Sequence, residues 1–263
     1  MDLTGRSALV TGSNRGIGNA LLEALAREPL DLLLAGMRDP AKFEAPKVGR
    51  AKEVRPVALD LGSRESIDEG CKGLGDDLAK IDLLINNAGL VTGGLLEEQK
   101  LDDIYPMIQV NLTGTIHLTH AVLPGMLKRG HGKVVNNASI SGYAYFPAAS
   151  TYAASKAGVV AFTESLRRET KGTGVTALHL VTGGVDTDML GETQDMYGNH
   201  LDTSGWDSVP ASEWADKVVQ AIKDDDDVLG PGGKTAIAKL ASRGPAFLLD
   251  QIAGRSFSRK PKY

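Results

Sequence analysis

Short apolar runs alternate with stretches of helical spacing over most of the chain. The runs are bounded by glycine or polar residues, as buried parallel strands are; the predicted strands are residues 7–11, 31–35, 54–59, 81–86, 133–138 and 175–181. Helices are predicted between them at 19–28, 63–79, 101–129 and 148–168. Because strands and helices alternate, the pattern predicts an α/β fold with a single Rossmann-like, doubly wound parallel sheet of about seven strands and helices on both faces.

The last third of the chain is less regular. Residues 182–210 mix Gly, Thr, Asp and Met without a clear period, so we expect this segment to be a substrate loop or disordered. A helix is predicted at 211–223, a short final strand and turn at 228–234, and further helix in the apolar stretch 235–257. Because no linker or repeat divides the chain, one domain is predicted over 1–263, with an extended C-terminal segment at 235–263.

A glycine-rich turn follows the first predicted strand. It consists of Gly12, Ser13, Asn14, Arg15, Gly16, Ile17 and Gly18. Glycines at such a junction let the backbone approach a pyrophosphate, and the following helix adds N–H donors and the positive end of its dipole. Glycines can also simply pack a helix on a strand. The place of this turn at the first strand-to-helix junction nevertheless favours a dinucleotide site.

The end of the second strand bears on the choice of cofactor. No acid stands at the strand end, where it would hold a ribose 2′-hydroxyl, and Arg38 follows instead. Arg38, together with Arg15 of the glycine turn, is suited to grip a 2′-phosphate. We therefore predict NADP(H). Asp39 keeps NAD(H) open, although it is also a suitable N-cap for residues 40–44.

A tyrosine and a lysine four residues apart form the candidate catalytic pair. Tyr152 and Lys156 fall on one face of the predicted helix 148–168. A nearby cation lowers the pKa of a phenol from about 10, so we expect Tyr152 to exchange protons with a carbonyl or alcohol oxygen near neutral pH. Ser139, directly after strand 133–138, offers a hydroxyl to the same oxygen. The alternative is an exposed Tyr–Lys pair on an amphipathic helix.

Composition narrows the class of protein. The 263 residues are 42% hydrophobic and 24% charged, as in ordinary globular proteins, and the net charge of −4 gives no reason to expect nucleic acid as a partner. The only cysteine, Cys71, cannot form an intramolecular disulfide, which favours a reducing compartment. No apolar stretch is long enough for a membrane span, and the N-terminus lacks a signal peptide's features. We therefore expect a cytoplasmic protein.

Several motifs, taken together, resemble the short-chain dehydrogenase/reductase family over residues 4–189. Residues 11–18 match the family's TGxxxGxG turn, residues 86–89 its NNAG motif, and Tyr152 and Lys156 its YxxxK motif. Asp60 and Leu61, after the third strand, resemble the pair that meets the adenine ring. Asn111 is similar to the family's helix asparagine, and residues 183–187 correspond to the loop that holds the nicotinamide amide.

The resemblance implies a role for each matching residue. Tyr152 would be the general acid in reduction and the base in oxidation, Lys156 would lower its pKa and hold the nicotinamide ribose, and Ser139 would polarise the carbonyl. Asn111 would hold a water for a proton relay. The implied cofactor-binding residues are Gly12, Ser13, Asn14, Arg15, Gly16, Ile17, Gly18, Arg38, Asp60, Leu61, Asn87, Ala88, Gly89, Tyr152, Lys156, Val185 and Thr187.

The sequence departs from the family pattern in two places. Thr182 precedes Gly183 where the family often has proline, so we expect a looser turn there. The C-terminal segment is also longer than the family's common end, which in many relatives builds a tetramer interface. A homodimer and a homotetramer therefore both stay open.

Simpler structural explanations account for the other candidate residues. Ser141 has the wrong spacing to Tyr152, and residues 224–227 are expected to be a solvated acidic run. No metal site is predicted, because His117, His120 and His131 lack ligand spacing. An apolar substrate pocket, or else ordinary loop packing, is expected from Tyr143, Tyr145, Phe146, Met189, Leu190 and Trp206.

Together these features predict an NADP(H)-dependent oxidoreductase. It would interconvert a carbonyl and a secondary alcohol on a small hydrophobic substrate, with Tyr152 as general acid/base. Two alternatives stay open: a non-catalytic NADPH-binding sensor or scaffold, and an NAD-dependent alcohol dehydrogenase of the same family.

Overall fold

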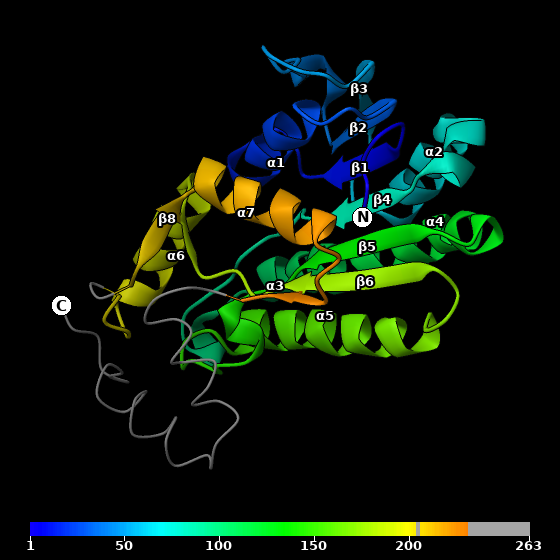
Figure 1. Cartoon of the computed structure of the whole chain (residues 1–263). Helices are drawn as coiled ribbons and strands as arrows, with labels where there is room; N and C mark the ends of the chain where they lie inside the picture. Colours follow the sequence, from blue (N-terminus) through cyan, green and yellow to red (C-terminus); the bar gives the residue numbers. More distant parts are fainter. Residues whose placement is uncertain (204–205, 231–263) are drawn as a thin grey trace.

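Seven parallel strands form one sheet at the centre of the computed structural model, which describes residues 1–203 and 206–230 (Figure 1). Their order across the sheet is β3-β2-β1-β4-β5-β6-β9. The strands are β1 (Ser7–Thr11), β2 (Leu32–Met37), β3 (Glu53–Ala58), β4 (Leu83–Asn86), β5 (Gly132–Asn137), β6 (Val175–Leu180) and β9 (Val228–Leu229). The predicted parallel sheet is therefore confirmed.

Helices cover both faces of this sheet. One core joins it to α1 (Gly16–Ala26) and α7 (Ala211–Lys223). The other joins it to α2 (Arg64–Leu74), α4 (Thr115–Arg129) and α5 (Ser150–Glu169) (Figure 1). After β3, at the edge of the sheet, the chain returns to form β4 on the free side of β1. The helices that follow β1 and β4 therefore pack on opposite faces of the sheet. Such a switch point leaves a crevice outside the carboxyl ends of the strands.

Local chemistry explains where several helices begin and end. The predicted cap Ser63 accepts a hydrogen bond from the backbone N–H of Ser66, at 3.2 Å. α2 stops at Gly75, whose φ of +53° favours glycine, so the predicted helix 63–79 continues only as a 3₁₀ turn (Gly75–Lys80). Other short 3₁₀ turns are η1 (Pro40–Lys42), η3 (Leu96–Glu98) and η5 (Ile140–Gly142).

The predicted helix 101–129 is helical throughout but not uniform. α3 (Leu101–Ile108) and α4 are joined by a π-helical segment (Gln109–Gly114). Such wide turns are frequent at functional sites. Here the wide turn includes Asn111, one of the predicted site residues.

The segment 182–210, predicted as a loop or disordered, contains regular structure. It holds β7 (Gly184–Asp186), α6 (Asp188–Gly198) and β8 (Ser208–Pro210), and β7 pairs with β8 as a separate two-stranded parallel sheet. The predicted final strand is β9, and the predicted helix 235–257 lies outside the described residues. None of the helices in the described part of the chain has the length and apolar character needed to cross a lipid bilayer.

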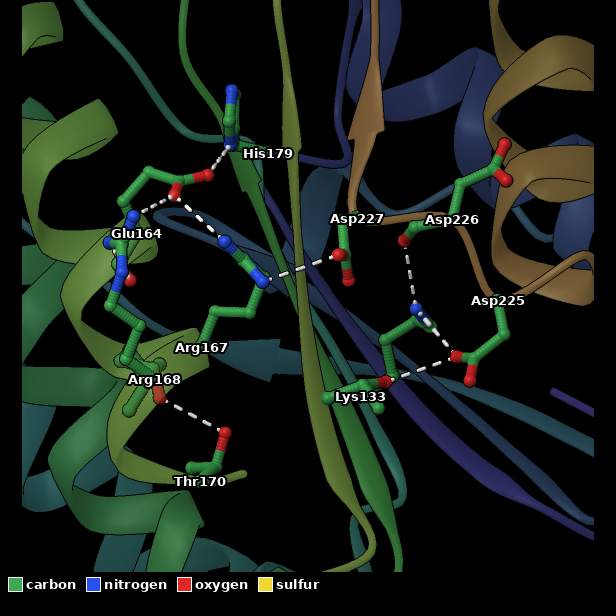
Figure 2. A network of polar contacts seen from close by, with 11 residues as sticks. Lys133, Glu164, Arg167, Arg168, Thr170, His179, Asp225, Asp226 and Asp227 are labelled. Atoms are coloured by element: carbon green, nitrogen blue, oxygen red, sulfur yellow. Dashed lines mark hydrogen bonds and ion pairs between the residues drawn. The ribbon is translucent and has the colours of Figure 1, made fainter. Parts of the chain in front are cut away.

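The acidic run 224–227 is exposed, as predicted, but it also forms ion pairs (Figure 2). The ammonium of Lys133 lies 2.8 Å from Asp225 Oδ1 and donates to the backbone carbonyl of Asp226 at 3.1 Å. Lys133 is fully buried, so these contacts supply the charge partner that a buried ammonium needs. Partial burial raises the pKa of Asp225, but the hydrogen bond and charge of Lys133 outweigh it and lower that pKa below 3.8.

We expect Asp225→Ala to lower the free energy of unfolding by about 2 kcal/mol. The change leaves the buried ammonium of Lys133 without its acid and places alanine at a φ of +60°. Urea unfolding measures this, and Asp224→Ala, one residue away, is the matched control expected to stay within about 0.5 kcal/mol of wild type. Because the pKa of Asp225 is lowered, its contribution is present above pH 3.8 and should be lost as the pH falls below that value. Equal stability of the two variants would contradict the assignment.

Candidate active site

The glycine turn is shaped so that only glycine fits at its two ends. Gly12 has a φ of +65°, and a Cβ there would stand 2.8 Å from the Cα of Ala88. A Cβ on Gly18 would stand 2.0 Å from the carbonyl oxygen of Gly12. α1 begins after Arg15 with no side-chain cap and no acid in its first turn. The first N–H groups of α1 are therefore suited to bind an anion.

A chain of hydrogen bonds joins the carboxyl ends of four neighbouring strands. Thr11 Oγ1 accepts from the backbone N–H groups of Asn87 and Ala88, both at 3.0 Å. The Asn137 amide donates to Asn87 Oδ1 at 2.9 Å, and the Thr182 hydroxyl donates to Asn137 Oδ1 at 2.5 Å. These bonds fix the loops after β1, β4, β5 and β6 relative to one another.

Thr182 is held firmly although it stands where the family often has proline. Besides donating to Asn137, it accepts a hydrogen bond from the Ile140 N–H on its carbonyl at 2.9 Å. The looser turn stays a prediction, although these two hydrogen bonds support the turn. The threonine hydroxyl ties down a turn that proline would otherwise stiffen through its ring.

Ser139, Tyr152 and Lys156 come together where β5 and α5 meet. Ser139 directly precedes η5 as its N-cap, while Tyr152 and Lys156 lie on α5. Ser139 lies close enough to Tyr152 for its hydroxyl to favour the phenolate. Lys156 Nζ lies 5.8 Å from the centre of the Tyr152 ring and donates to the Asn137 carbonyl at 2.8 Å. The three side chains expected to act together thus share one location.

Burial changes the proton affinity of this pair against the expectation from sequence. Burial raises the pKa of Tyr152 to about 12, and the hydrogen bond with Ser139 only partly opposes it. Burial also lowers the pKa of Lys156 to about 8. The prediction that the lysine lowers the pKa of the tyrosine below 10 is therefore wrong, because desolvation disfavours the phenolate more than neighbouring groups favour it.

Most of the predicted residues line one cavity of about 410 Å³ at the carboxyl end of the sheet. The predicted residues that line it are Gly12, Asn14, Arg15, Gly16, Ile17, Gly18, Arg38, Asp60, Leu61, Asn87, Ala88, Gly89, Ser139, Tyr152, Lys156, Val185 and Thr187. Ser13 lies behind this wall, where its hydroxyl donates to the Gly36 carbonyl at 3.1 Å.

Asn111 also lies behind the cavity wall. Its Oδ1 accepts from the Leu90 N–H at 2.8 Å, and its Nδ2 donates to the Leu90 carbonyl at 2.9 Å and to Ser155 Oγ at 3.0 Å. Its side chain therefore fixes the loop after β4 against α5. The water-holding role implied by the resemblance stays a prediction.

The two arginines expected at the cofactor end differ in their surroundings. Arg38 is exposed just beyond β2. Arg15 is half exposed and lies 3.8 Å from a carboxylate oxygen of Glu192 in α6. Asp39 caps the turn that follows it, because its carboxylate accepts from the Ala41 N–H at 3.2 Å. The capping explanation of Asp39 is thus confirmed.

The opposite end of the cavity is largely apolar, and only part of the predicted set forms it. Phe146, Met189, Leu190 and Trp206 line it, but Tyr145 is 64% exposed and Tyr143 is bonded elsewhere, to His179. Ser141 also lines the cavity, although Ser139 is the serine whose hydroxyl acts on the pKa of Tyr152.

Tyr197 belongs to this wall and was missed from the sequence. It is buried, donates to the Thr92 carbonyl at 3.2 Å and meets the Trp206 ring edge-on at 6.1 Å. A Cβ on Gly93 would overlap its ring, so the chain has glycine where Tyr197 approaches. Tyr197 and the glycine after it match no sequence motif. Only the fold of residues 182–210 brings it to the cavity.

The described residues also bear on metals. Within 1–203 and 206–230, no three His, Cys, Asp or Glu side chains gather as a metal site requires. His117 lies 3.1 Å from Asp68, and His131 lies 2.9 Å from Asp82. These two histidines are therefore paired with single acids.

The sequence of this chain is similar to known proteins of one family. The model of the short chain dehydrogenase family matches residues 6–198. A 3-oxoacyl-[acyl-carrier-protein] reductase of Vibrio cholerae is 35% identical over 74% of this chain and 80% of its own length. A similar reductase of Haemophilus influenzae is 34% identical over 71% of this chain and 77% of its own.

The fold comparison agrees with the sequence comparison. A short chain dehydrogenase from Burkholderia cenocepacia, solved in complex with NADP, superimposes with a TM-score of 0.80. It is 26% identical, and the match covers 96% of this chain and 99% of the other. The chain belongs to the short-chain dehydrogenase/reductase family of oxidoreductases.

Proposed function

We propose that the protein uses NADP(H) to interconvert a carbonyl and a secondary alcohol on a small, largely apolar substrate. The observation that carries this proposal is the meeting of Ser139, Tyr152 and Lys156 with the glycine turn in the wall of one cavity. A proton donor and an anion-binding turn would then serve one reaction.

The residues of the cavity fit a dinucleotide. The tight turn at Gly12 and Gly18 and the uncapped start of α1 suit a pyrophosphate. Asp60 and Leu61 stand beside Arg38 in the wall, where an adenosine would lie. When bound, the nicotinamide supplies or accepts the hydride.

The chain's own residues would handle the proton at the substrate oxygen. With a pKa of about 12, Tyr152 is protonated at neutral pH and can donate its proton to an oxygen that gains negative charge. Ser139, beside Tyr152 in the cavity wall, would donate to the same oxygen and stabilise that charge. Lys156, with a pKa of about 8, is largely protonated at pH 7 and favours anionic character at Tyr152.

The raised pKa of Tyr152 means that the phenol is protonated near neutral pH, as reduction of a carbonyl needs. Reduction needs a protonated phenol, which is the form that burial stabilises. Oxidation needs the phenolate, whose population rises only with pH. The names of the Vibrio and Haemophilus relatives, both reductases, support the same direction.

Two observations support NADP(H) over NAD(H). Arg38 is exposed in the cavity wall beyond β2, while the carboxylate of Asp39 is occupied in capping the next turn. The related Burkholderia protein is in complex with NADP. An arginine and no free acid at this strand end favour a 2′-phosphate.

We expect Tyr152→Phe to lower kcat for carbonyl reduction at least a hundredfold. The change keeps the packing of the ring but removes the proton that the substrate oxygen would receive. NADPH oxidation with a panel of ketones measures the rate, and fluorescence titration should show NADPH affinity within about twofold of wild type. Tyr145→Phe, on an exposed ring nearby, is the matched control and should keep full activity. Near-normal turnover of Tyr152→Phe would refute the assignment.

We expect Arg38→Ala to weaken NADPH binding about ten- to a hundredfold and leave NADH binding nearly unchanged. Only NADPH carries the 2′-phosphate that the guanidinium would bind. Titration of both cofactors measures the difference. Arg50→Ala is the control, because Arg50 is exposed and its backbone N–H donates to Ala26, at the end of α1 away from the glycine turn. An equal loss for both cofactors would argue against the NADP(H) preference. Tight NADPH binding without turnover of any ketone or alcohol would instead favour a sensor.

A further inference from the structure

We propose that Tyr143 and His179 are positioning residues for the proposed reaction, because together they anchor the turn that begins at Ser139. The inference rests on the proposed function, in which Ser139 contacts the substrate oxygen. Neither residue lines the cavity in the described part of the chain, so both would act through the turn.

The first contact joins the turn to the sheet. Tyr143 directly follows η5, and its hydroxyl lies 2.6 Å from Nε2 of His179 on β6. The two rings are also stacked, with centres 6.0 Å apart. His179 is 2% exposed and Tyr143 is half-buried, so this short hydrogen bond is partly shielded from water, which strengthens it.

The second contact joins the sheet to α5, the helix that bears Tyr152 and Lys156. The other ring nitrogen of His179, Nδ1, lies 3.5 Å from a carboxylate oxygen of Glu164 on α5 (Figure 2). Burial raises the pKa of Glu164, but the hydrogen bond and charge of Arg167, with the charges of His179 and Arg168, outweigh it and lower that pKa. With Glu164 ionised, Nδ1 carries the proton that faces the carboxylate, and Nε2 and the Tyr143 hydroxyl share the proton of their 2.6 Å hydrogen bond.

Glu164 is itself held in place. Arg167 and Arg168 contact its Oε2 at 3.1 and 3.0 Å, and Arg167 also lies 3.4 Å from Asp227, ahead of β9 (Figure 2). The connection from Tyr143 through His179 therefore ends on a side chain with several fixed partners. Because Glu164 has these partners, it can hold the orientation of the His179 ring.

The anchored turn packs directly against the proposed catalytic residues. A Cβ on Gly142 would stand 2.9 Å from the backbone carbonyl oxygen of Lys156, so the turn lies in close contact with α5 at that residue. The Ser139 carbonyl accepts from the Gly142 N–H at 3.0 Å. A shift at Tyr143 would therefore be passed to Ser139 within one turn of chain.

Two substitutions of His179 separate the two contacts. In glutamine the amide is as many bonds from Cα as Nε2, so His179→Gln can keep the bond to Tyr143. In asparagine the amide matches Nδ1, so His179→Asn can keep only the contact with Glu164. Tyr143→Phe removes the same bond from the other side, and Tyr145→Phe is the control on an exposed ring two residues away.

We expect Tyr143→Phe and His179→Asn to lower kcat about tenfold or more, with KM for NADPH unchanged. His179→Gln should stay within about threefold of wild type. Hydrogen exchange of the backbone amides at residues 140–143 should accelerate in the first two variants and not in His179→Gln or Tyr145→Phe. A catalytic loss that His179→Gln shares in full, or unchanged exchange and kcat in Tyr143→Phe, would overturn the proposal.

The two readouts keep this inference separate from the proposed function. If the wild-type protein reduces no carbonyl of the panel, the proposed function fails and the positioning role for it falls as well. If the wild type is active and exchange accelerates while kcat holds, the anchor exists but the positioning role is refuted. Faster exchange together with a lower kcat supports the role.

Discussion

The site depends on a line of hydrogen bonds that crosses the carboxyl ends of the central strands. Thr11 and Asn137 end β1 and β5, Asn87 and Thr182 lie just after β4 and β6, and each is bonded to the next. Lys156 is bonded to the same line through the Asn137 carbonyl. Parallel strands direct their loops to one edge but do not fix those loops relative to one another. Here the polar line does so, and the cavity has its shape because four loops cannot move independently.

Burial and charge oppose each other at the candidate proton donor. Removal from water strengthens each hydrogen bond that Tyr152 and Ser139 could make to a substrate oxygen. The same burial raises the pKa of Tyr152 to about 12 and lowers that of Lys156 to about 8. The two groups are therefore further apart in proton affinity than free tyrosine and lysine, whose pKa values are 10.0 and 10.5, and Tyr152 stays protonated near neutral pH.

The sequence was sufficient for features that depend on local chemistry and on the order of elements. The sheet, the glycine turn and the cap at Ser63 follow from periodicity and residue type, and strand order then brings Ser139 and Lys156 together. Contacts between segments far apart in the chain could not be predicted in this way. Tyr197 reaches the cavity only because α6 folds back over it, and the pKa of Tyr152 depends on how much surrounding structure excludes water. Neither property produces a hydrophobic period or a motif in the sequence.

The short ladder between β7 and β8 closes a ring of chain around α6. Gly184 pairs with Ser208 and Asp186 with Pro210, so the chain leaves and rejoins the body of the protein beside one short parallel ladder. This ladder is a sheet of its own and contributes no strand to the seven-stranded sheet. Insertions, deletions or a different helix within the ring would reshape the outer wall around Tyr197 and leave the register of the seven strands intact. Over evolutionary time, the molecules admitted could diversify while the groups that handle the proton stay fixed.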